Sequence, residues 1–164
     1  ITDTVREHLI KLGDKRPELI FWTDSRHRAG LFTNVVLKCN AKETLVSLSW
    51  PVDDQSPEKL TQAGYALSAK TGRPLFLTRG EDGIIVFDKD TSEPVKGISI
   101  SGPVDPTGAG DSVTASAVLS LCSGASLAEA ALIANLVASI TVQKLGETGT
   151  ASPSELPDRL EVWR

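Results

Sequence analysis

Short apolar runs alternate along the chain with longer segments in which apolar residues recur every three or four positions. The short runs are bounded by polar or turn-forming residues, as buried strands usually are. The predicted strands are residues 18–25, 34–40, 74–78, 84–88 and 95–100. The predicted helices are residues 2–13, a segment between 40 and 50, residues 57–70, 110–123 and 126–145, and a short helix within 150–163. Helices that alternate with buried strands are typical of an α/β fold whose mostly parallel sheet is covered on both faces.

Polar residues mark where these helices begin, and glycines mark where two of them are expected to end. Ser56 stands before a proline, and Ser126 is followed three residues later by Glu129. Both arrangements cap the first turn of a helix. Gly13 and Gly146 are expected just past the ends of the first and the last long helix, because glycine adopts the left-handed conformation that terminates helices.

The segment RGEDG joins the predicted strands 74–78 and 84–88, and its Asp82-Gly83 pair is a strong hairpin signal. We therefore expect antiparallel strands at one edge of the sheet. No internal repeat, low-complexity segment or interdomain linker interrupts the sequence, so residues 1–164 are expected to form one domain.

Composition narrows the classes of function. The 164 residues are 40% hydrophobic and 23% charged, as in a globular protein, and the net charge of −4 comes from interspersed acids and bases. We expect no nucleic-acid partner, because no basic face is indicated, and no membrane partner, because no apolar run could cross a bilayer. Cys39 and Cys122 lie in apolar surroundings without metal-ligand spacing, which predicts buried thiols and a cytoplasmic location.

The segment DPTGAGD at residues 105–111 places a glycine-rich turn and an acid where a helix is expected to begin. The first turn of a helix exposes N–H groups without intrahelical partners, and the helix dipole is positive there. Glycines let an anion approach these groups, so Gly108 and Gly110 are candidates for a phosphate cradle. Asp111 would then accept a proton from a hydroxyl group that attacks the phosphorus.

A simpler interpretation of this segment stays open, namely a strand-to-helix turn with an acid in the first turn. Other motifs are excluded. No Lys-Ser/Thr pair follows, as a Walker A loop requires, and Val113 replaces the third glycine of a dinucleotide loop. The sequence also holds no GxSxG nucleophile elbow.

DPTGAGD resembles the signature of the ribokinase (PfkB) family of carbohydrate kinases, roughly D-[TP]-[TV]-G-A-G-D. Four further segments resemble family motifs in the family's order: TDSR (23–26), NAKE (40–43), TRGEDG (78–83) and IANLVAS (133–139). The resemblance covers essentially all 164 residues, but only the C-terminal half or so of a family member. Because the chain begins with Ile1 and contains no Met, we expect it to be part of a longer protein.

The resemblance implies a ribokinase-like three-layer α/β/α fold that uses ATP and Mg²⁺. It implies that Asp111 is the general base and that the N–H groups of Gly108, Ala109 and Gly110 form an anion hole for the γ-phosphate. It also implies that Thr78, Gly80, Gly83 and Thr107 contact the nucleotide. Asn135 is expected either to contact the adenine or to hydrogen-bond to nearby backbone.

Two acids are implied as metal ligands. Glu43, with Asn40, belongs to the N-x-x-E motif that holds Mg²⁺ and the phosphates in the family, although the same spacing is a helix-capping arrangement. The family usually has Pro where this chain has Cys39. In some members a monovalent cation such as K⁺ is held at the positions of Asp105 and of the loop 146–152.

The predicted function is ATP-dependent phosphorylation of a hydroxyl group on a sugar or sugar-like small molecule. Two alternatives stay open: a non-catalytic nucleotide-binding module acting through protein contacts, and a nucleoside or vitamin-type kinase of the same fold. In the family, the N-terminal half recognises the acceptor and carries a small β-sheet lid that often forms a dimer contact. We expect this sequence to lack both, so a homodimer would form through a segment outside it.

Overall fold

The computed structural model describes residues 1–146 and 148–164, which form two compact units. The first, here the N-terminal unit, comprises Ile1–Thr78 with Val86–Glu93. The second, here the C-terminal unit, comprises Arg79–Ile85 with Pro94–Arg164. The expectation of a single domain stays a prediction.

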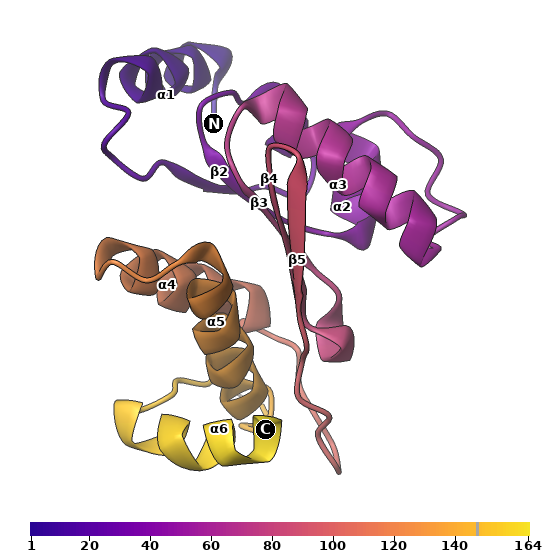
Figure 1. The fold of residues 1–164 in the computed structure, drawn as a ribbon, viewed down its shortest axis with the longest axis vertical. Coiled ribbons are helices and arrows are strands. Elements are labelled where there is room, and N and C mark those ends of the chain that lie inside the picture. Colours follow the sequence, from indigo (N-terminus) through magenta and orange to yellow (C-terminus); the bar gives the residue numbers. More distant parts are fainter. Residues whose placement is uncertain (147) are drawn as a thin grey trace. The chain divides into compact units, whose positions relative to one another are not determined.

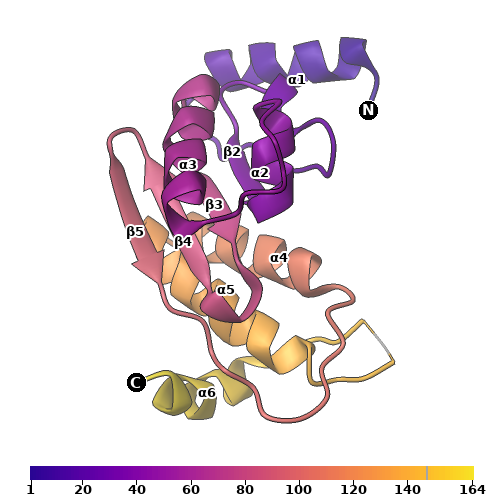
Figure 2. The ribbon, with the colours of Figure 1, turned by 90° about the vertical axis from the view of Figure 1, so that its right-hand side faces the viewer.

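A five-stranded sheet has the strand order β1-β2-β3-β4-β5 (Figure 1). The strands are β1 (Trp22–Asp24), β2 (Val36–Asn40), β3 (Leu75–Thr78), β4 (Ile84–Asp88) and β5 (Thr91–Val95). β1, β2 and β3 are parallel, and the register aligns Asp24 with Lys38 and Asn40 with Thr78. The hairpin of β4 and β5 forms one edge, as Figure 2 shows. Asn40 and Thr78 therefore stand side by side where two parallel strands end, the edge at which α/β sheets bind ligands.

The N-terminal unit packs helices against these strands. Its helices are α1 (Asp3–Lys15), the 3₁₀ turn η1 (Ala29–Leu31), α2 (Ala41–Ser47) and α3 (Pro57–Thr71). Its core consists of fully buried side chains that include Leu37, Leu45, Leu67, Leu75, Phe76, Leu77 and Phe87. α3 lies close to β4, because the Ser68 hydroxyl donates to the Phe87 carbonyl at 3.4 Å and Gly64 leaves room for the Phe87 ring.

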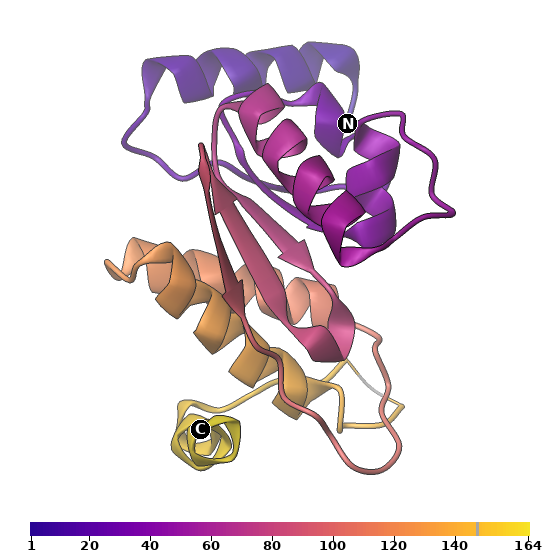
Figure 3. The same ribbon diagram turned by 45° about the vertical axis from the view of Figure 1, so that its right-hand side comes forward.

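The C-terminal unit is mainly helical. It contains the 3₁₀ turn η2 (Gly80–Asp82), α4 (Ala109–Cys122), α5 (Leu127–Thr141), the 3₁₀ turn η3 (Pro153–Glu155) and α6 (Leu156–Trp163). α4 and α5 pack side by side, and α6 lies against α5 (Figure 3). Both helices bury small residues: Ala117 of α4 and Ala130 and Ala134 of α5 are fully buried.

The predicted helix starts are confirmed. The Ser56 hydroxyl accepts a hydrogen bond from the Lys59 N–H at 3.4 Å at the start of α3. At the start of α5, Ser126 accepts from the Glu129 N–H at 3.3 Å, while the Glu129 carboxylate accepts from the Ser126 N–H at 2.7 Å. Each cap satisfies N–H groups that the helix itself cannot pair.

Two predicted helix ends are wrong. Gly13 lies inside α1, which runs on to Lys15, and a Cβ atom at Gly13 would come within 3.1 Å of the Asn34 carbonyl oxygen. This glycine therefore serves close packing instead of termination. α5 ends at Thr141, so Gly146 follows it only after a turn. The cap is Val142, whose N–H donates to the Ala138 carbonyl.

The last predicted strand is also misplaced. The strand that pairs with β4 is Thr91–Val95, whose first four residues are exposed, and residues 96–100 are not in a strand. Exposed edge strands carry no apolar pattern, which explains the error. One of the two predicted buried thiols is also wrong, because Cys122 is exposed whereas Cys39 is buried.

Gly64 offers a direct test of the packing between α3 and β4. A Cβ atom at this position would lie 2.2 Å from the Phe87 ring. Alanine normally stabilises a helix interior by about 1 kcal/mol relative to glycine. We expect Gly64→Ala instead to lower the free energy of unfolding by about 1–3 kcal/mol, because the ring must shift. Urea denaturation measures this, with exposed Gln62→Ala in the same helix as the control, and an unchanged or higher stability of Gly64→Ala would contradict it.

Candidate functional site

The start of α4 is built to leave backbone N–H groups open. Gly108 is its N-cap residue, with a φ of 78°, and no side chain caps the helix. The N–H group of Ala109 donates to the Pro106 carbonyl at 3.1 Å. Among the described residues, the N–H groups of Gly108, Gly110 and Asp111 have no hydrogen-bond acceptor.

The open helix start creates a positive site. In α1, α2, α3 and α5 a side-chain oxygen of the N-cap residue accepts a hydrogen bond from an N–H group of the first turn. α4, like the short C-terminal helix α6, has no such capping hydrogen bond, and the nearest side-chain charge at its start is the Asp111 carboxylate. An anion such as a phosphoryl group is the ligand that such a helix start favours.

Asp111 lies in the first turn of α4, immediately after these open groups. Its side chain is exposed, and within the described part of the chain it makes no hydrogen bond or ion pair. A carboxylate engaged with another side chain would be unable to accept a proton readily. Asp111 therefore has no competing partner in the described chain, while its role as a proton acceptor beside a bound anion stays a prediction.

Asp105 fixes the turn that leads into α4. Its two carboxylate oxygens accept hydrogen bonds from the Thr107 N–H at 2.9 Å and from the Gly146 N–H at 3.2 Å. Its own N–H donates to the Val142 carbonyl at 2.7 Å. Hydrogen bonds from Thr107 and then from Gly146 hold the pKa of Asp105 below its ordinary value. Asp105 therefore ties the turn before α4 to the loop after α5.

The loop after α5 also touches the glycine at the start of α4. A Cβ atom on Gly108 would lie 2.7 Å from the Thr148 side chain. Gly108 is needed for this contact as well as for its left-handed backbone. Glu147, part of the predicted cation loop 146–152, lies outside the described residues.

The second group of predicted residues lies in the N-terminal unit. Asn40 caps α2: its side-chain oxygen accepts from the Glu43 N–H at 2.9 Å, and a Glu43 carboxylate oxygen accepts from the Asn40 N–H at 2.9 Å. Thr78 aligns with Asn40 and donates to the Cys39 carbonyl at 3.5 Å. The capping interpretation is therefore confirmed for both motif residues, while their contact with nucleotide or metal stays a prediction.

The third group surrounds the segment 95–97 in the C-terminal unit. Gly83, with a φ of 89°, lies so close to this segment that a Cβ atom would be 2.2 Å from the Val95 carbonyl oxygen. Gly80 also has a positive φ, of 60°, and has open space around it. The Asn135 side-chain nitrogen donates to the carbonyls of Val95 and Lys96, each at 3.1 Å. The backbone alternative for Asn135 is thus observed, and only its side-chain oxygen is left for a contact with adenine.

Sequence reasoning missed a buried charge in the N-terminal unit, two residues before Asn40. Lys38 is 7% exposed, in a central strand, and forms an ion pair with Asp24 of the neighbouring strand β1. The signal was available, because Lys38 lies two residues before Asn40 and so points to the same face of the sheet. Cys39, between them, is inert: burial raises the pKa of its thiol to about 12.

The acids present suit Mg²⁺ only in part. Mg²⁺ in phosphate-transfer sites is usually held by one or two carboxylates together with substrate phosphates. Among the described residues there is no cluster of three or more His, Cys, Asp or Glu side chains. Glu43 fits the role, because one of its oxygens caps α2 and no contact of the other is recorded in the described chain. Asp105 fits a metal poorly, because backbone donors already engage both of its oxygens.

Comparison with known proteins identifies the family of this chain. The model of the pfkB family of carbohydrate kinases matches residues 23–155, and the chain therefore belongs to this family. It is 37% identical over 119 residues to the bifunctional protein HldE of Trichlorobacter lovleyi, covering 71% of this chain and 23% of that protein. It is 35% identical over 127 residues to the HldE protein of Citrifermentans bemidjiense, covering 74% and 24%. The chain thus spans about a quarter of the length of these relatives.

Solved structures share the fold. The structure of Arabidopsis thaliana ribokinase complexed with ribose and ATP matches with a TM-score of 0.80 at 21% identity, over 98% of this chain and 53% of that one. Escherichia coli phosphofructokinase-2 in complex with substrates and products matches with a TM-score of 0.76 at 19% identity, over 96% and 53%. The predicted ribokinase-like three-layer α/β/α fold is confirmed. In the described residues, no helix combines the length and apolar character needed to span a bilayer.

The hydrogen bonds of Asp105 predict a pH dependence. Because its pKa is lowered in the folded chain, its contribution to stability is present above its ordinary pKa of about 3.9 and is lost as the pH falls through the lower folded value. Thermal melts of the wild type and of Asp105→Asn should therefore differ most at pH 6 and converge toward pH 3. The other acids with lowered pKa values are present in both proteins, so their contributions cancel in the difference between the two melting temperatures. A gap that stays constant with pH would contradict this role.

The capping box at Asn40 makes a second prediction. Asn40→Ala removes the acceptor for the Glu43 N–H, so we expect the free energy of unfolding to fall by about 1 kcal/mol. Asn40→Ser keeps an acceptor of similar capping strength and should cost much less. Chemical denaturation of both variants tests this, and equal losses would show that the cap contributes nothing.

Proposed function

We propose that this chain is the nucleotide-binding and phosphoryl-transfer part of a kinase that phosphorylates a hydroxyl group on a sugar or sugar-like molecule with ATP. The observation that carries the proposal is the open start of α4, where N–H groups and a carboxylate that have no partner among the described residues adjoin one another. The pfkB family description supports a carbohydrate acceptor. A cytoplasmic location remains part of the proposal.

The N–H groups of Gly108, Gly110 and Asp111 would receive the transferring phosphoryl group. Ala109 is left out of this set, because its N–H already donates to Pro106. Donors held in place before the reaction stabilise the charge on the transferring oxygens without reorganising. The left-handed backbone of Gly108 and its contact with Thr148 hold these donors in position.

Asp111 would accept the proton of the attacking hydroxyl group. It stands next to the proposed anion site and has no competing partner among the described residues. Phosphoryl transfer needs little covalent chemistry from the protein, so the positions of the donors and of this base are the main contribution. Mg²⁺, when bound, would neutralise charge on the phosphates. In the N-terminal unit, Glu43 is the residue that would hold it, and Asn40 and Thr78 end the adjacent strands β2 and β3.

The glycine turn and Asn135 would define the nucleotide's other contacts. Gly80 has open space around it, so its backbone is accessible to a ligand. Thr107 would orient the anion site through its bond to Asp105. Asn135 would act through the segment 95–97, which it anchors next to Gly83.

The decisive variant is Asp111→Asn, compared with Glu58→Gln. Glu58 is also an exposed acid in the first turn of a helix, but lies in α3 away from the motif. We expect Asp111→Asn to lower turnover at least about 100-fold, the range for loss of a general base, while it still binds ATP. Glu58→Gln should match the wild type. A coupled ADP-release assay over a panel of sugars measures turnover, and titration calorimetry measures ATP binding.

The outcomes separate the alternatives. Undiminished turnover of Asp111→Asn would refute the general base. Turnover is measured on the complete protein that contains this chain, because the acceptor-binding half is expected to lie outside it. Binding of ATP by that protein without turnover on any sugar or nucleoside would instead support a non-catalytic nucleotide-binding module. Turnover on nucleosides alone would keep the mechanism and change the acceptor class. No ATP binding would refute the proposed site as a whole.

A further inference from the structure

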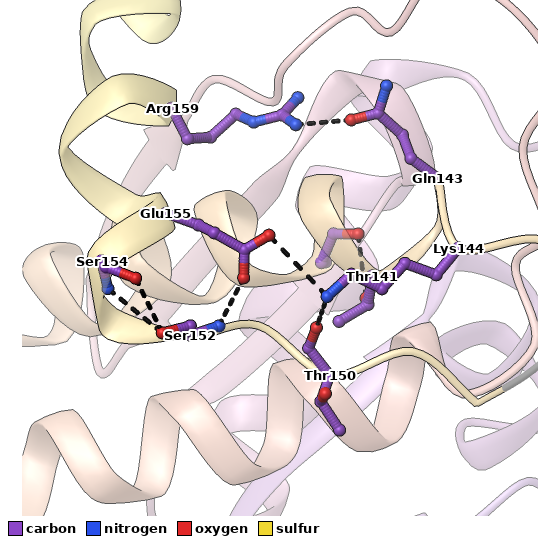
Figure 4. A network of polar contacts seen from close by, with 9 residues as sticks. Thr141, Gln143, Lys144, Thr150, Ser152, Ser154, Glu155 and Arg159 are labelled. Carbon is purple, nitrogen blue, oxygen red and sulfur yellow. Dashed lines mark hydrogen bonds and ion pairs between the residues drawn. The ribbon is translucent and has the colours of Figure 1, made fainter.

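Lys144 is the centre of a polar network in the loop that follows α5 (Figure 4). Its ammonium group donates a hydrogen bond to the Thr150 carbonyl and pairs with a Glu155 carboxylate oxygen at 3.7 Å. The other Glu155 oxygen accepts from the Ser152 N–H at 2.6 Å. Lys144 thus closes the loop onto the start of η3, and only 33% of its side chain is exposed.

The same network extends along the neighbouring turn of α6. The Arg159 guanidinium donates to the Gln143 side-chain oxygen, next to Lys144 in the chain (Figure 4). Gly149 packs so closely on the end of α5 that a Cβ atom would lie 2.6 Å from the Thr141 carbonyl oxygen and 3.0 Å from the Lys144 Cβ atom. Side-chain and backbone contacts therefore fold the ends of this loop tightly over Lys144.

This loop is in turn bound to the segment that begins α4. The Gly146 N–H donates to Asp105, and the Thr148 side chain lies against Gly108. A loop shape that displaced Thr148 would remove its contact with Gly108. Because Gly108 directly precedes the open N–H groups, the loop lies in contact with the start of the proposed anion site.

The described oxygens of this loop, which do not include those of Glu147, leave limited capacity for a monovalent cation. Such an ion would be held by carboxylate and carbonyl oxygens. Each Asp105 oxygen already accepts one backbone N–H group and the Thr150 carbonyl accepts from Lys144, so each has only part of its acceptor capacity left. The ammonium group also places a positive charge inside the loop, which repels a second cation.

We propose that Lys144 is a positioning residue that supplies the positive charge of this loop from within the chain, so that the loop holds Gly108 and the start of α4 without a monovalent cation. The part that concerns phosphate binding rests on the proposed function. The part that concerns the loop itself stands on the hydrogen bonds of Lys144, Asp105 and Glu155 and can be tested without a nucleotide.

The first test measures thermal unfolding in KCl and in tetramethylammonium chloride at equal ionic strength. The wild type should unfold at the same temperature in both salts. Lys144→Gln should unfold at a lower temperature in tetramethylammonium chloride and regain part of the loss as KCl is added, because K⁺ can then enter among the freed oxygens. Lys144→Arg should resemble the wild type, and Lys15→Gln, which changes an exposed lysine of α1, is the control.

Two results of this test would overturn the proposal. One is a saturable stabilisation of the wild type by KCl that tetramethylammonium chloride does not produce, which would show a cation site. The other is a Lys144→Gln variant that is as stable as Lys15→Gln in both salts. A loss that neither KCl nor the arginine variant restores would mean that Lys144 only packs, and would also overturn it.

The second test measures ATP affinity by calorimetry in the same two salts. We expect Lys144→Gln to bind ATP about fivefold or more weakly in tetramethylammonium chloride, the usual lower range of coupling between linked sites, and KCl to restore most of the affinity. Equal affinity of this variant and the wild type would overturn the link between the loop and the anion site. If the wild type binds no ATP, the proposed function fails, whereas the melting experiment still decides the role of Lys144.

Discussion

The constraint on which this structure depends is the set of N–H groups that α4 leaves unpaired at its start. A helix start without a cap costs stability unless solvent or a ligand satisfies its donors. The chain caps α1, α2, α3 and α5 with side chains and leaves α4 open. The residues before this helix start are held by the loop after α5: Gly108 packs against it, and Asp105 accepts a hydrogen bond from it.

The rest of the C-terminal unit supports that arrangement. α5 packs along α4, and its end carries the loop that Lys144 closes. Asp105 bonds to both sides of the junction, at Thr107 and at Gly146. The N-terminal unit contributes a separate polar edge, where Asn40 and Thr78 end adjacent parallel strands. Each unit thus presents backbone or amide donors at an element end, which suits phosphate ligands.

Much of this was predictable from the sequence, for identifiable reasons. The buried strands β2, β3 and β4 and the caps at Ser56 and Ser126 follow from local patterns, and the structure confirms them. The strand predicted over residues 18–25 is shorter, Trp22–Asp24, and none of its residues is buried. β5 was misplaced because an exposed edge strand has no apolar pattern. Gly13 was predicted to end a helix, but it serves a contact with Asn34, which is far away in the chain. In the candidate site, the motif located Gly108 and Asp111. The bonds of Asn135 to Val95 and of Lys144 to Thr150 depend on tertiary packing that no local pattern encodes.

The most direct measurement of the central claim is a titration of the ¹⁵N-labelled chain, followed by amide NMR, with a non-hydrolysable ATP analogue and, separately, with AMP. If the start of α4 binds the terminal phosphoryl group, the amide signals of Gly108, Gly110 and Asp111 should shift with the triphosphate and stay in place with AMP. The opposite result is a shift of the signals of Gly80 and its neighbours while those three remain unchanged. It would contradict phosphate binding at this helix, because the nucleotide would then bind without contacting the start of α4.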